Sequence, residues 1–292
     1  MLNGEIIQGQ ISDVNEDKYF VQHQGTTYAL DKNEIEKTLS IGDPFHGFVY
    51  EDKNHRLRIT SLIPEISKED FGWAKVVDIR RDLGVFVDIG LPDKDIVISL
   101  DELPEGNQFW PQKEDMVYIK LSCDSKNRLW GHLAVEEDLQ KLATKAGKQL
   151  MNYNVEARVY KILNVGAQVF TTQNLMGFIH ESEMLNPVRL GELVSARIID
   201  VHPDGKINIS SRPRAYQAIE DDSQMLLALL KKNPNHYLPL HDKTDPDIIK
   251  DYLGISKGQF KRAVGGLLKE KRIRQEKNDG IYLLDNLGEG DD

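Results

Sequence analysis

Residues 1–213 consist largely of short stretches in which apolar and polar side chains alternate. Val85, Val87 and Ile89 share one phase of such a stretch, while Phe86 and Asp88 share the other. Because successive side chains of a β-strand point to opposite faces, this pattern predicts a strand with its aliphatic side in a core. Phe86 then points outward, on the same face as Asp88.

The same arrangement occurs three times along the chain, which indicates an internal repeat. The copies match best at their closing hairpins, which read DKNHRLRI from residue 52, DSKNRLWG from residue 124 and HPDGKINI from residue 202. Each is a turn-rich stretch between alternating, β-branched runs. Short strands in repeats of this size favour a small closed five-stranded barrel over a sandwich, which needs more strands.

Outward aromatic residues recur at matching places in the repeat. Phe20 lies out of phase with Tyr19 and Val21 in the first copy, and Phe170 lies out of phase with Ala167 in the third. A ring on the outside of a small barrel either contacts a ligand or packs beneath a loop. The sequence leaves both interpretations open.

The pattern changes after the third copy, where apolar side chains recur with helical spacing. Asp245 and Gly254 stand where an N-cap and a C-terminal glycine are expected, and Ser256 and Gln259 have the spacing of a capping box. A hairpin with a turn at Asp279–Gly280 is expected to follow. The order helix, helix, basic helix, hairpin predicts a winged helix-turn-helix domain.

Two local features refine this prediction. Leu139, Leu142 and Ala146 are spaced i, i+3, i+7, which predicts a helical connector over 136–149. Gly265 and Gly266 lie inside the basic helix, where each costs about 1 kcal/mol relative to alanine. Two such residues suggest that another element packs closely against this helix.

These patterns predict a mainly β protein with a C-terminal α+β domain. Three tandem five-stranded OB-type barrels are expected at 1–64, 65–135 and 150–213, with the connector at 136–149. The winged helix-turn-helix domain is expected at 214–286, and an acidic tail at 287–292.

Composition narrows the functional classes. The longest apolar runs are too short to span a bilayer, and the N-terminus lacks the basic and apolar regions of a signal peptide. The single cysteine, Cys123, excludes an intrachain disulfide and a cysteine-based zinc site. We therefore expect a cytoplasmic protein.

Motifs of catalysis are absent from the sequence, which contains no GxSxG, Walker loop, HExxH or paired-cysteine pattern. His180 lies beside Glu181 and Glu183, but a metal needs a further convergent ligand that the sequence does not identify. We expect no catalytic residue, no metal site and no cofactor, and hence a protein that is not an enzyme.

Charge is distributed unevenly over a chain whose net charge is −10. Residues 65–140 hold 9 basic and 17 acidic side chains, whereas residues 141–214 hold 10 basic and 6 acidic ones. Residues 256–277 alone hold 8 basic and 2 acidic side chains. A local basic surface attracts phosphate backbones even where the whole chain is acidic, so nucleic acid is expected at the C-terminal half.

The third copy closely resembles the S1 RNA-binding domain, a version of the OB barrel. The resemblance rests on VYKILNVGAQVF (159–170), LMGFIHESEM (175–184), LGELVSARIIDV (190–201) and DGKINISSR (204–212). The second copy resembles it through VVDIRRDLGVFVDIG (76–90), and the first copy matches it least. In that family an outward face carries two aromatic residues, one histidine, one acidic and one basic residue, which contact single-stranded RNA.

The contacts implied by this resemblance are incomplete in every copy. The third copy keeps His180 and Lys206 but has Val165 and Gln168 at the aromatic positions and His202 at the acidic one, with Phe170 as a substitute ring. In the second copy the resemblance implies Phe86, Asp124 and Arg128, with Leu83 and Ser99 as departures, and in the first it implies Phe20, Asp52 and Arg56. We therefore expect no single barrel to bind strongly by itself.

Single-stranded RNA suits these residues, because every base has a face that an exposed ring can stack on and basic side chains track the phosphates. The main RNA surface is expected on the third barrel and the winged helix. Its candidate residues are Arg158, Lys161, Phe170, His180, Arg189, Arg197, Lys206, Arg212, Arg214, Lys257, Lys261, Arg262, Lys269, Arg272 and Arg274. Weaker candidates are Phe20, Arg56, Phe86 and Arg128.

The order of three such barrels and a winged helix resembles the bacterial conserved virulence factor B family over nearly the whole chain. The resemblance implies a non-catalytic RNA-binding protein that regulates the expression of virulence genes. Two alternatives stay open, a DNA-binding transcription regulator that uses the winged helix and a scaffold whose acidic second barrel binds a basic protein. We expect a monomer that does not contact membranes.

Overall fold

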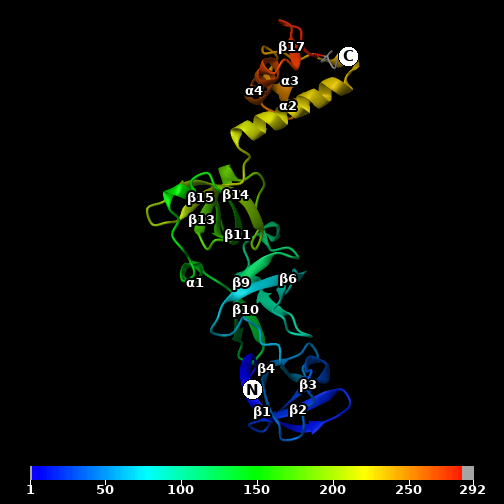
Figure 1. The fold of residues 1–292 in the computed structure, drawn as a ribbon, viewed down its shortest axis with the longest axis vertical. Helices are drawn as coiled ribbons and strands as arrows, with labels where there is room; N and C mark the ends of the chain where they lie inside the picture. Colours follow the sequence, from blue (N-terminus) through cyan, green and yellow to red (C-terminus); the bar gives the residue numbers. More distant parts are fainter. Residues whose placement is uncertain (1, 285–292) are drawn as a thin grey trace, which may run out of the picture. The chain divides into compact units, whose positions relative to one another are not determined.

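A computed structural model describes residues 2–284 of the chain, and this part folds into two compact units (Figure 1). The first unit ends at Arg212 and contains three closed barrels, and the second begins at Pro213 and contains three α-helices and a small sheet. Residues 285 and 286 of the expected winged helix domain, and the expected acidic tail, lie outside the described residues. No helix among the described residues is both long and apolar enough to cross a membrane.

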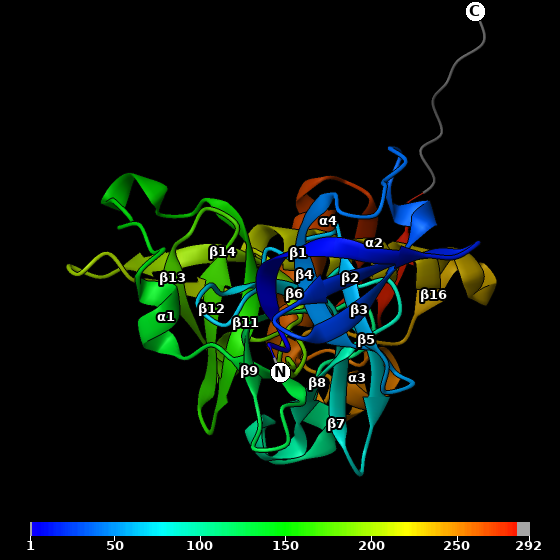
Figure 2. The ribbon, with the colours of Figure 1, turned by 90° about the horizontal axis from the view of Figure 1, so that it is seen from below.

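Each barrel closes from five strands with the same topology, in which the third strand pairs in parallel with the fifth. Figure 2 shows the strands of the first barrel in blue. The first barrel consists of β1 (Glu5–Val14), β2 (Lys18–His23), β3 (Thr26–Asp31), β4 (Pro44–Glu51) and β5 (Leu57–Thr60). The second consists of β6 (Gly72–Arg80), β7 (Gly84–Asp88), β8 (Ile96–Ser99), β9 (Met116–Cys123) and β10 (Leu129–Leu133). The third consists of β11 (Asn154–Leu163), β12 (Gly166–Thr171), β13 (Met176–His180), β14 (Leu193–Val201) and β15 (Ile207–Ser210).

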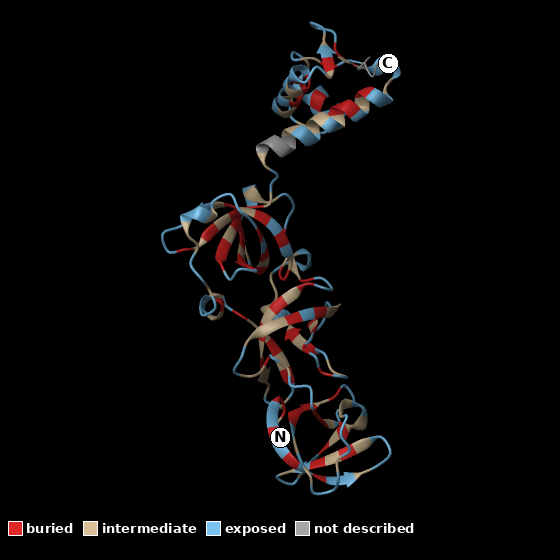
Figure 3. Ribbon diagram, in the orientation of Figure 1, coloured by how far each residue is buried: buried red, intermediate tan, exposed pale blue. Residues whose placement is uncertain are grey.

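Alternation along the strands divides core from surface as the sequence predicts (Figure 3). Val85 and Val87 are fully buried, while Phe86 between them is half-exposed. Phe20 is likewise half-exposed between buried neighbours. Phe170 departs from this rule, because it points away from the core of its barrel and is nevertheless only 3% exposed.

The connector between the second and third barrels is less helical than expected. Only α1 (Glu136–Gln140) is an α-helix, and the 3-10 helix η4 (Lys148–Leu150) follows after a gap. In that gap the backbone N–H of Thr144 donates to the carbonyl oxygen of Asn174, and that of Ala146 donates to Gly205. Turns of the third barrel therefore satisfy backbone groups that a longer helix would have paired internally.

The second unit has the elements predicted for a winged helix. They are α2 (Ala215–Lys232), β16 (Tyr237–Leu238), α3 (Pro246–Leu253), α4 (Lys257–Lys269), β17 (Ile273–Gln275) and β18 (Ile281–Leu283). The Asp245 side chain accepts from the N–H of Asp247, and Gly254 ends α3 with a φ of 73°. Ser256 and Gln259 form the capping box of α4, so the predicted helix boundaries are confirmed. The predicted hairpin is also present, but its turn lies at 277–279, earlier than the predicted Asp279–Gly280, because Gly280 already pairs with Glu276.

The remaining described helices are short 3-10 turns within loops. They are η1 (Lys32–Glu34), η2 (Leu100–Glu102), η3 (Asn107–Phe109), η5 (Glu181–Glu183) and η6 (Pro234–His236).

The expectation that Gly265 and Gly266 allow close packing is wrong. A methyl group at Gly265 would meet no neighbouring atom within 4 Å, and one at Gly266 would meet only the hydroxyl of Ser223 at 3.9 Å. Both glycines therefore carry the conformational cost of glycine in a helix without a packing gain.

We predict that Gly265→Ala stabilises α4 by about 0.5–1 kcal/mol, because alanine loses less backbone entropy in a helix than glycine. Slower amide hydrogen exchange along α4 in the whole chain would report the gain. Gly84→Ala is the opposite case, since its φ is +132° and its Cβ would lie 2.0 Å from the carbonyl oxygen of Ile98. Gly84→Ala should therefore destabilise the second barrel. Faster amide exchange along α4 in Gly265→Ala would contradict the stabilisation predicted for that variant.

Candidate nucleic-acid interface

The register of the strands places one outward row of five residues across each barrel. In the first barrel this transverse row is Asp13, Phe20, Ala29, Arg58 and Tyr50. In the second it is Asp78, Phe86, Val97, Trp130 and Ser122. In the third it is Lys161, Gln168, Phe178, Asn208 and Asp200. Equivalent positions can therefore be compared directly among the three barrels.

Two residues of the transverse row of the first barrel, Arg58 and Tyr50, contact the second barrel. Arg58 is only 2% exposed and forms ion pairs with Asp31 and, at 3.8 Å, with Asp93 of the second barrel. The hydroxyl of Tyr50 donates to Asp93 at 2.8 Å. Burial of the Tyr50 hydroxyl is the main cause that raises its pKa, and the hydrogen bond to Asp93 raises the pKa further. This part of the row holds two barrels together.

Of the weaker candidates on the first barrel, Phe20 is half-exposed and Arg56 is exposed. The guanidinium of Arg56 donates to Asp52 at 2.9 Å, so its charge is already partly compensated.

The transverse row of the third barrel meets helix α1 of the connector. The Glu136 carboxylate accepts from Lys206 Nζ at 2.6 Å and from Gln168 Nε2 at 2.9 Å. The hydrogen bond from Lys206 is the main cause that lowers the pKa of Glu136, and the hydrogen bond from Gln168 lowers it further. The hydrogen bond between Lys206 and Glu136 also raises the pKa of Lys206. Lys206 is thus held by an internal carboxylate.

Phe170 is covered by the same helix. Leu139 of α1, which is fully buried, packs in one cluster with Tyr160, Phe170 and Met176. The expectation that Phe170 stands open to a base is therefore wrong for this structure, because a side chain distant in sequence closes over it. The ring is covered, as in the alternative interpretation, but by helix α1 and not by a loop.

Two further candidates lie at the junction of the second and third barrels. Arg189 donates to both carboxylate oxygens of Asp115, at 2.7 and 2.9 Å, and Asp115 is only 7% exposed. This contact raises the pKa of Arg189. Arg158 stacks over Trp73 at 5.4 Å and donates to the carbonyl of Gly191 at 3.1 Å, and its burial lowers its pKa. Arg158 and Arg189 therefore join the two barrels in this structure and are only partly exposed.

Other candidates on the first unit are accessible. Lys161, His180 and Arg212 are exposed, and Arg197 is half-exposed. Nδ1 of His180 accepts from the N–H of Ser182 at 3.2 Å, so in the neutral ring the proton lies on Nε2. His180 therefore offers a hydrogen-bond donor to a ligand.

The candidates on the second unit lie mainly on its surface. Lys261, Arg262, Lys269 and Arg274 are exposed, while Arg214, Lys257 and Arg272 are half-exposed. Arg274 stacks over Tyr282 at 4.2 Å and pairs with Glu276. The exposed cations of α4 are thus presented to solvent on a helix whose opposite face is buried through Phe260 and Leu267.

The transverse row of the second barrel carries two half-exposed aromatic rings, Phe86 and Trp130, on either side of Val97. The guanidinium of Arg80 lies 4.8 Å from the Phe86 ring, and that of Arg128 lies 5.7 Å from the Trp130 ring. Sequence reasoning missed Trp130, although its alternation with buried Leu129 and Gly131 could have identified it.

Polar groups fix the surroundings of Trp130. Asp124 accepts from Arg128 Nε at 2.8 Å and from Trp130 Nε1 at 3.3 Å. Hydrogen bonds from Arg128, led by its backbone N–H, lower the pKa of Asp124 to about 2. His132, also missed, lies between Glu102 and the Ser122 hydroxyl, with its Nε2 at 2.6 Å from the latter. Trp130 and His132 line one groove of about 470 Å³.

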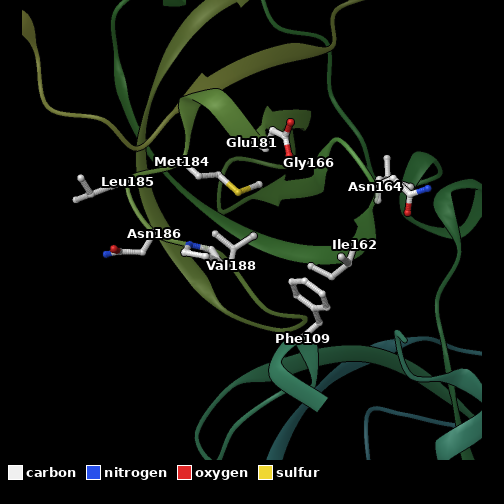
Figure 4. Close-up of a pocket in the computed structure, with 11 residues that line it drawn as sticks. Phe109, Ile162, Asn164, Gly166, Glu181, Met184, Leu185, Asn186 and Val188 are labelled. Atoms are coloured by element: carbon white, nitrogen blue, oxygen red, sulfur yellow. The ribbon is translucent and has the colours of Figure 1, made fainter. Parts of the chain in front are cut away.

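A separate, mainly apolar pocket of about 310 Å³ lies at one end of the third barrel (Figure 4). Phe109 from the second barrel faces it together with Ile162, Met184 and Val188, and Asn164 adds a polar group. No sequence pattern predicted this pocket, because it depends on how the two barrels meet.

Comparison with protein families divides the chain as the structure does. Residues 3–62 match the S1 domain, residues 71–132 the first S1-like domain of CvfB, and residues 139–213 the second domain of the virulence regulatory factor CvfB. Residues 224–283 match the CvfB-like winged helix domain.

Whole proteins of similar sequence are known. The chain is 36% identical over 258 residues to the uncharacterized protein YitL of Bacillus subtilis, covering 88% of this chain and 86% of that protein. It is 35% identical to conserved virulence factor B of Staphylococcus epidermidis, covering 87% and 88%. A crystal structure of a multidomain protein with nucleic acid binding domains from Streptococcus pneumoniae is 45% identical, with a TM-score of 0.69 and coverage of 97% and 98%.

We predict that Leu139→Ala releases α1 from the third barrel. Loss of a fully buried leucine costs about 2–4 kcal/mol, so the amide protons of Leu142 and Ala143 should exchange at least tenfold faster. Leu142→Ala is the matched control, because this side chain is 45% exposed. Equal effects of the two variants, measured by hydrogen exchange of the whole chain, would contradict the packing described for Leu139.

Proposed function

Because the chain belongs to the conserved virulence factor B family, we propose that it binds single-stranded RNA and regulates gene expression without catalysing a reaction. Three S1-type barrels and a winged helix support a nucleic-acid ligand, as does the similar multidomain protein named for its nucleic acid binding domains. The naming of relatives as virulence factors supports a regulatory role. The cytoplasm, which contains the RNA, is the proposed location.

The observation that carries this proposal is the exposure of basic side chains on the two C-terminal domains. Lys161 and Arg212 on the third barrel, and Lys261 and Arg262 on α4, are all exposed. Lysine and arginine side chains that neutralise phosphates release the counterions condensed on the nucleic acid, and this release supplies the sequence-independent part of the affinity. We propose these exposed residues, with His180, as the RNA contacts of the third barrel and the winged helix.

A single strand is favoured over a duplex because the outer faces of the first and second barrels carry partly exposed aromatic rings. Phe20 and Phe86 on the outer barrel faces are half-exposed, and stacking on such rings requires unpaired bases.

The second candidate function is transcription regulation by binding duplex DNA. It is favoured by α4 alone, whose exposed basic residues suit a helix that binds in a DNA groove.

Neutralising the basic surface should weaken RNA binding in a salt-dependent way. For a chain carrying Lys161→Ala, Arg212→Ala, Lys261→Ala and Arg262→Ala together, we expect at least tenfold weaker binding of a single-stranded RNA. The slope of log affinity against log salt should fall by about 0.7 for each phosphate that the variant no longer neutralises. Fluorescence anisotropy over a salt series measures both quantities.

Two controls make that experiment decisive. Lys37→Ala with Lys53→Ala removes exposed charges from the first barrel and should leave the affinity nearly unchanged. A DNA duplex of equal length should bind more weakly than the RNA. Tighter binding of the duplex, or an equal loss in the control variant, would favour the second candidate function or another surface.

His180→Ala should weaken RNA binding by a few-fold, since one hydrogen bond from its Nε2–H contributes on the order of 1 kcal/mol. The exposed ring makes its described hydrogen bonds only with Ser182, so the fold should be retained. Circular dichroism would check the fold, and anisotropy the affinity. An unchanged affinity would remove His180 from the interface, and unfolding would assign it a structural role.

A further inference from the structure

The mainly apolar pocket of about 310 Å³ at the end of the third barrel is built from three segments (Figure 4). The β11–β12 hairpin supplies Ile162, the segment between η5 and β14 supplies Met184 and Val188, and η3 of the second barrel supplies Phe109. The side chains of these four residues face the same space. This cavity is here called the Met184 pocket.

Backbone hydrogen bonds hold the walls of the Met184 pocket together. The N–H of Leu190 donates to the carbonyl oxygen of Phe109 at 2.9 Å, and the N–H of Glu181 donates to the turn between β11 and β12 at 3.0 Å. The ion pair of Arg189 with Asp115, at 2.7 Å, fixes the same junction. Because the walls are tied before a ligand arrives, binding requires little further ordering of the chain.

A single carboxylate supplies the charge of the Met184 pocket. Glu181 is exposed, and it is the one charged residue among the eleven that line the pocket. Among the described residues, no side chain forms an ion pair or hydrogen bond with its carboxylate. Asn164 and Asn186 add uncharged amides to the lining. A free carboxylate beside an apolar cavity attracts a cationic group and repels a phosphate.

Exposed apolar side chains continue the apolar surface beyond the cavity. Leu185, which belongs to the lining, is 63% exposed, and Val165, between the lining residues Asn164 and Gly166, is 53% exposed. Apolar residues that gather at one place and are rimmed by polar groups mark interaction sites, whereas scattered ones are ordinary. A segment of polypeptide can cover these residues, which a small molecule confined to the cavity leaves in solvent.

We propose that the Met184 pocket binds a linear segment of a partner protein. The segment places one bulky apolar side chain in the pocket and a neighbouring lysine or arginine beside Glu181. The pocket volume lies at the lower end of the range of ligand pockets, roughly 300–1,000 Å³, which suits a single anchoring side chain. The flexible Met184 side chain can adapt to the shape of that anchor. This site goes beyond RNA binding and does not depend on it.

An unpaired nucleobase is the alternative occupant, and the charges disfavour it. The pocket lining contains no lysine or arginine, and a base brings a phosphate that the Glu181 carboxylate repels. A lysine or arginine of a protein carries the opposite charge. Because exposed ion pairs contribute little, the apolar anchor supplies most of the affinity and the charge selects the segment.

Methyl NMR of the whole chain tests this proposal, because Ile162, Met184 and Val188 carry methyl groups in the pocket. The probe is a short peptide with one phenylalanine between two lysines and glycine elsewhere. The three methyl resonances should shift on titration, while those of Leu226 and Leu267 in the core of the second unit stay in place. Alanine in place of the phenylalanine of the peptide should weaken binding roughly tenfold or more, the scale for burying one such ring.

Variants of the chain separate the two parts of the site. Glu181→Gln should weaken peptide binding by up to about fivefold at low salt, the range for one exposed ion pair, and have no effect at high salt. Glu156→Gln is the matched control, because Glu156 is an exposed glutamate of the same barrel outside the pocket lining. Phe109→Ala removes an apolar wall and should weaken binding about tenfold, whereas Phe109→Leu, which keeps an apolar side chain, should retain binding within a few-fold.

The proposal is overturned if the phenylalanine peptide leaves the pocket methyl resonances in place. Equal binding of the alanine peptide, or of a peptide with glutamates in place of its lysines, would also contradict it. Equal losses in Glu181→Gln and Glu156→Gln would place the ligand elsewhere. Shifts of the same methyl groups by an oligouridylate would assign the pocket to a nucleobase. Binding of phenethylamine alone, as tight as that of the peptide, would assign it to a small molecule.

Discussion

Closing five short strands into a barrel forces each strand to place alternate side chains in a shared core and on an outer face. The inner phase is mainly aliphatic in the second and third barrels and adds Tyr19 and Tyr28 in the first, and burial of that surface is the main stabilising contribution. Because the inner phase is fixed by packing, the barrels differ in their outer phase. The functions of the three barrels therefore depend on what covers that face.

The outer faces of the three barrels make different contacts. Arg58 and Tyr50 of the first barrel join it to the second through Asp93. Gln168 and Lys206 of the third barrel bind Glu136, while Leu139 covers Phe170. A buried or half-buried charge is stable only with a partner, so these carboxylates supply internally what a ligand would otherwise supply. Phe86 and Trp130 on the outer face of the second barrel are partly exposed and carry Arg80 and Arg128 over their rings.

Much of the fold could be predicted because it depends on local patterns. Period-two alternation located the barrel strands, and Asp245, Gly254 and the Ser256–Gln259 capping box located the ends of α3 and α4. The position of Phe170 could not be predicted, since its burial depends on Leu139 some 30 residues away. The pairing of Arg189 with Asp115 likewise depends on how two barrels meet. Trp130 could have been predicted by the same alternation, since Leu129 and Gly131 on either side of it are buried.

The proposed RNA contacts lie on accessible outer faces of the C-terminal half of the chain. Ultraviolet crosslinking of the whole chain in cells, with identification of both the nucleic acid and the crosslinked peptides, tests this placement. We expect RNA crosslinks on peptides of the third barrel and on α4, and none on the peptide that contains Arg58. Crosslinks concentrated around Arg58, or recovered mainly with DNA, would contradict it.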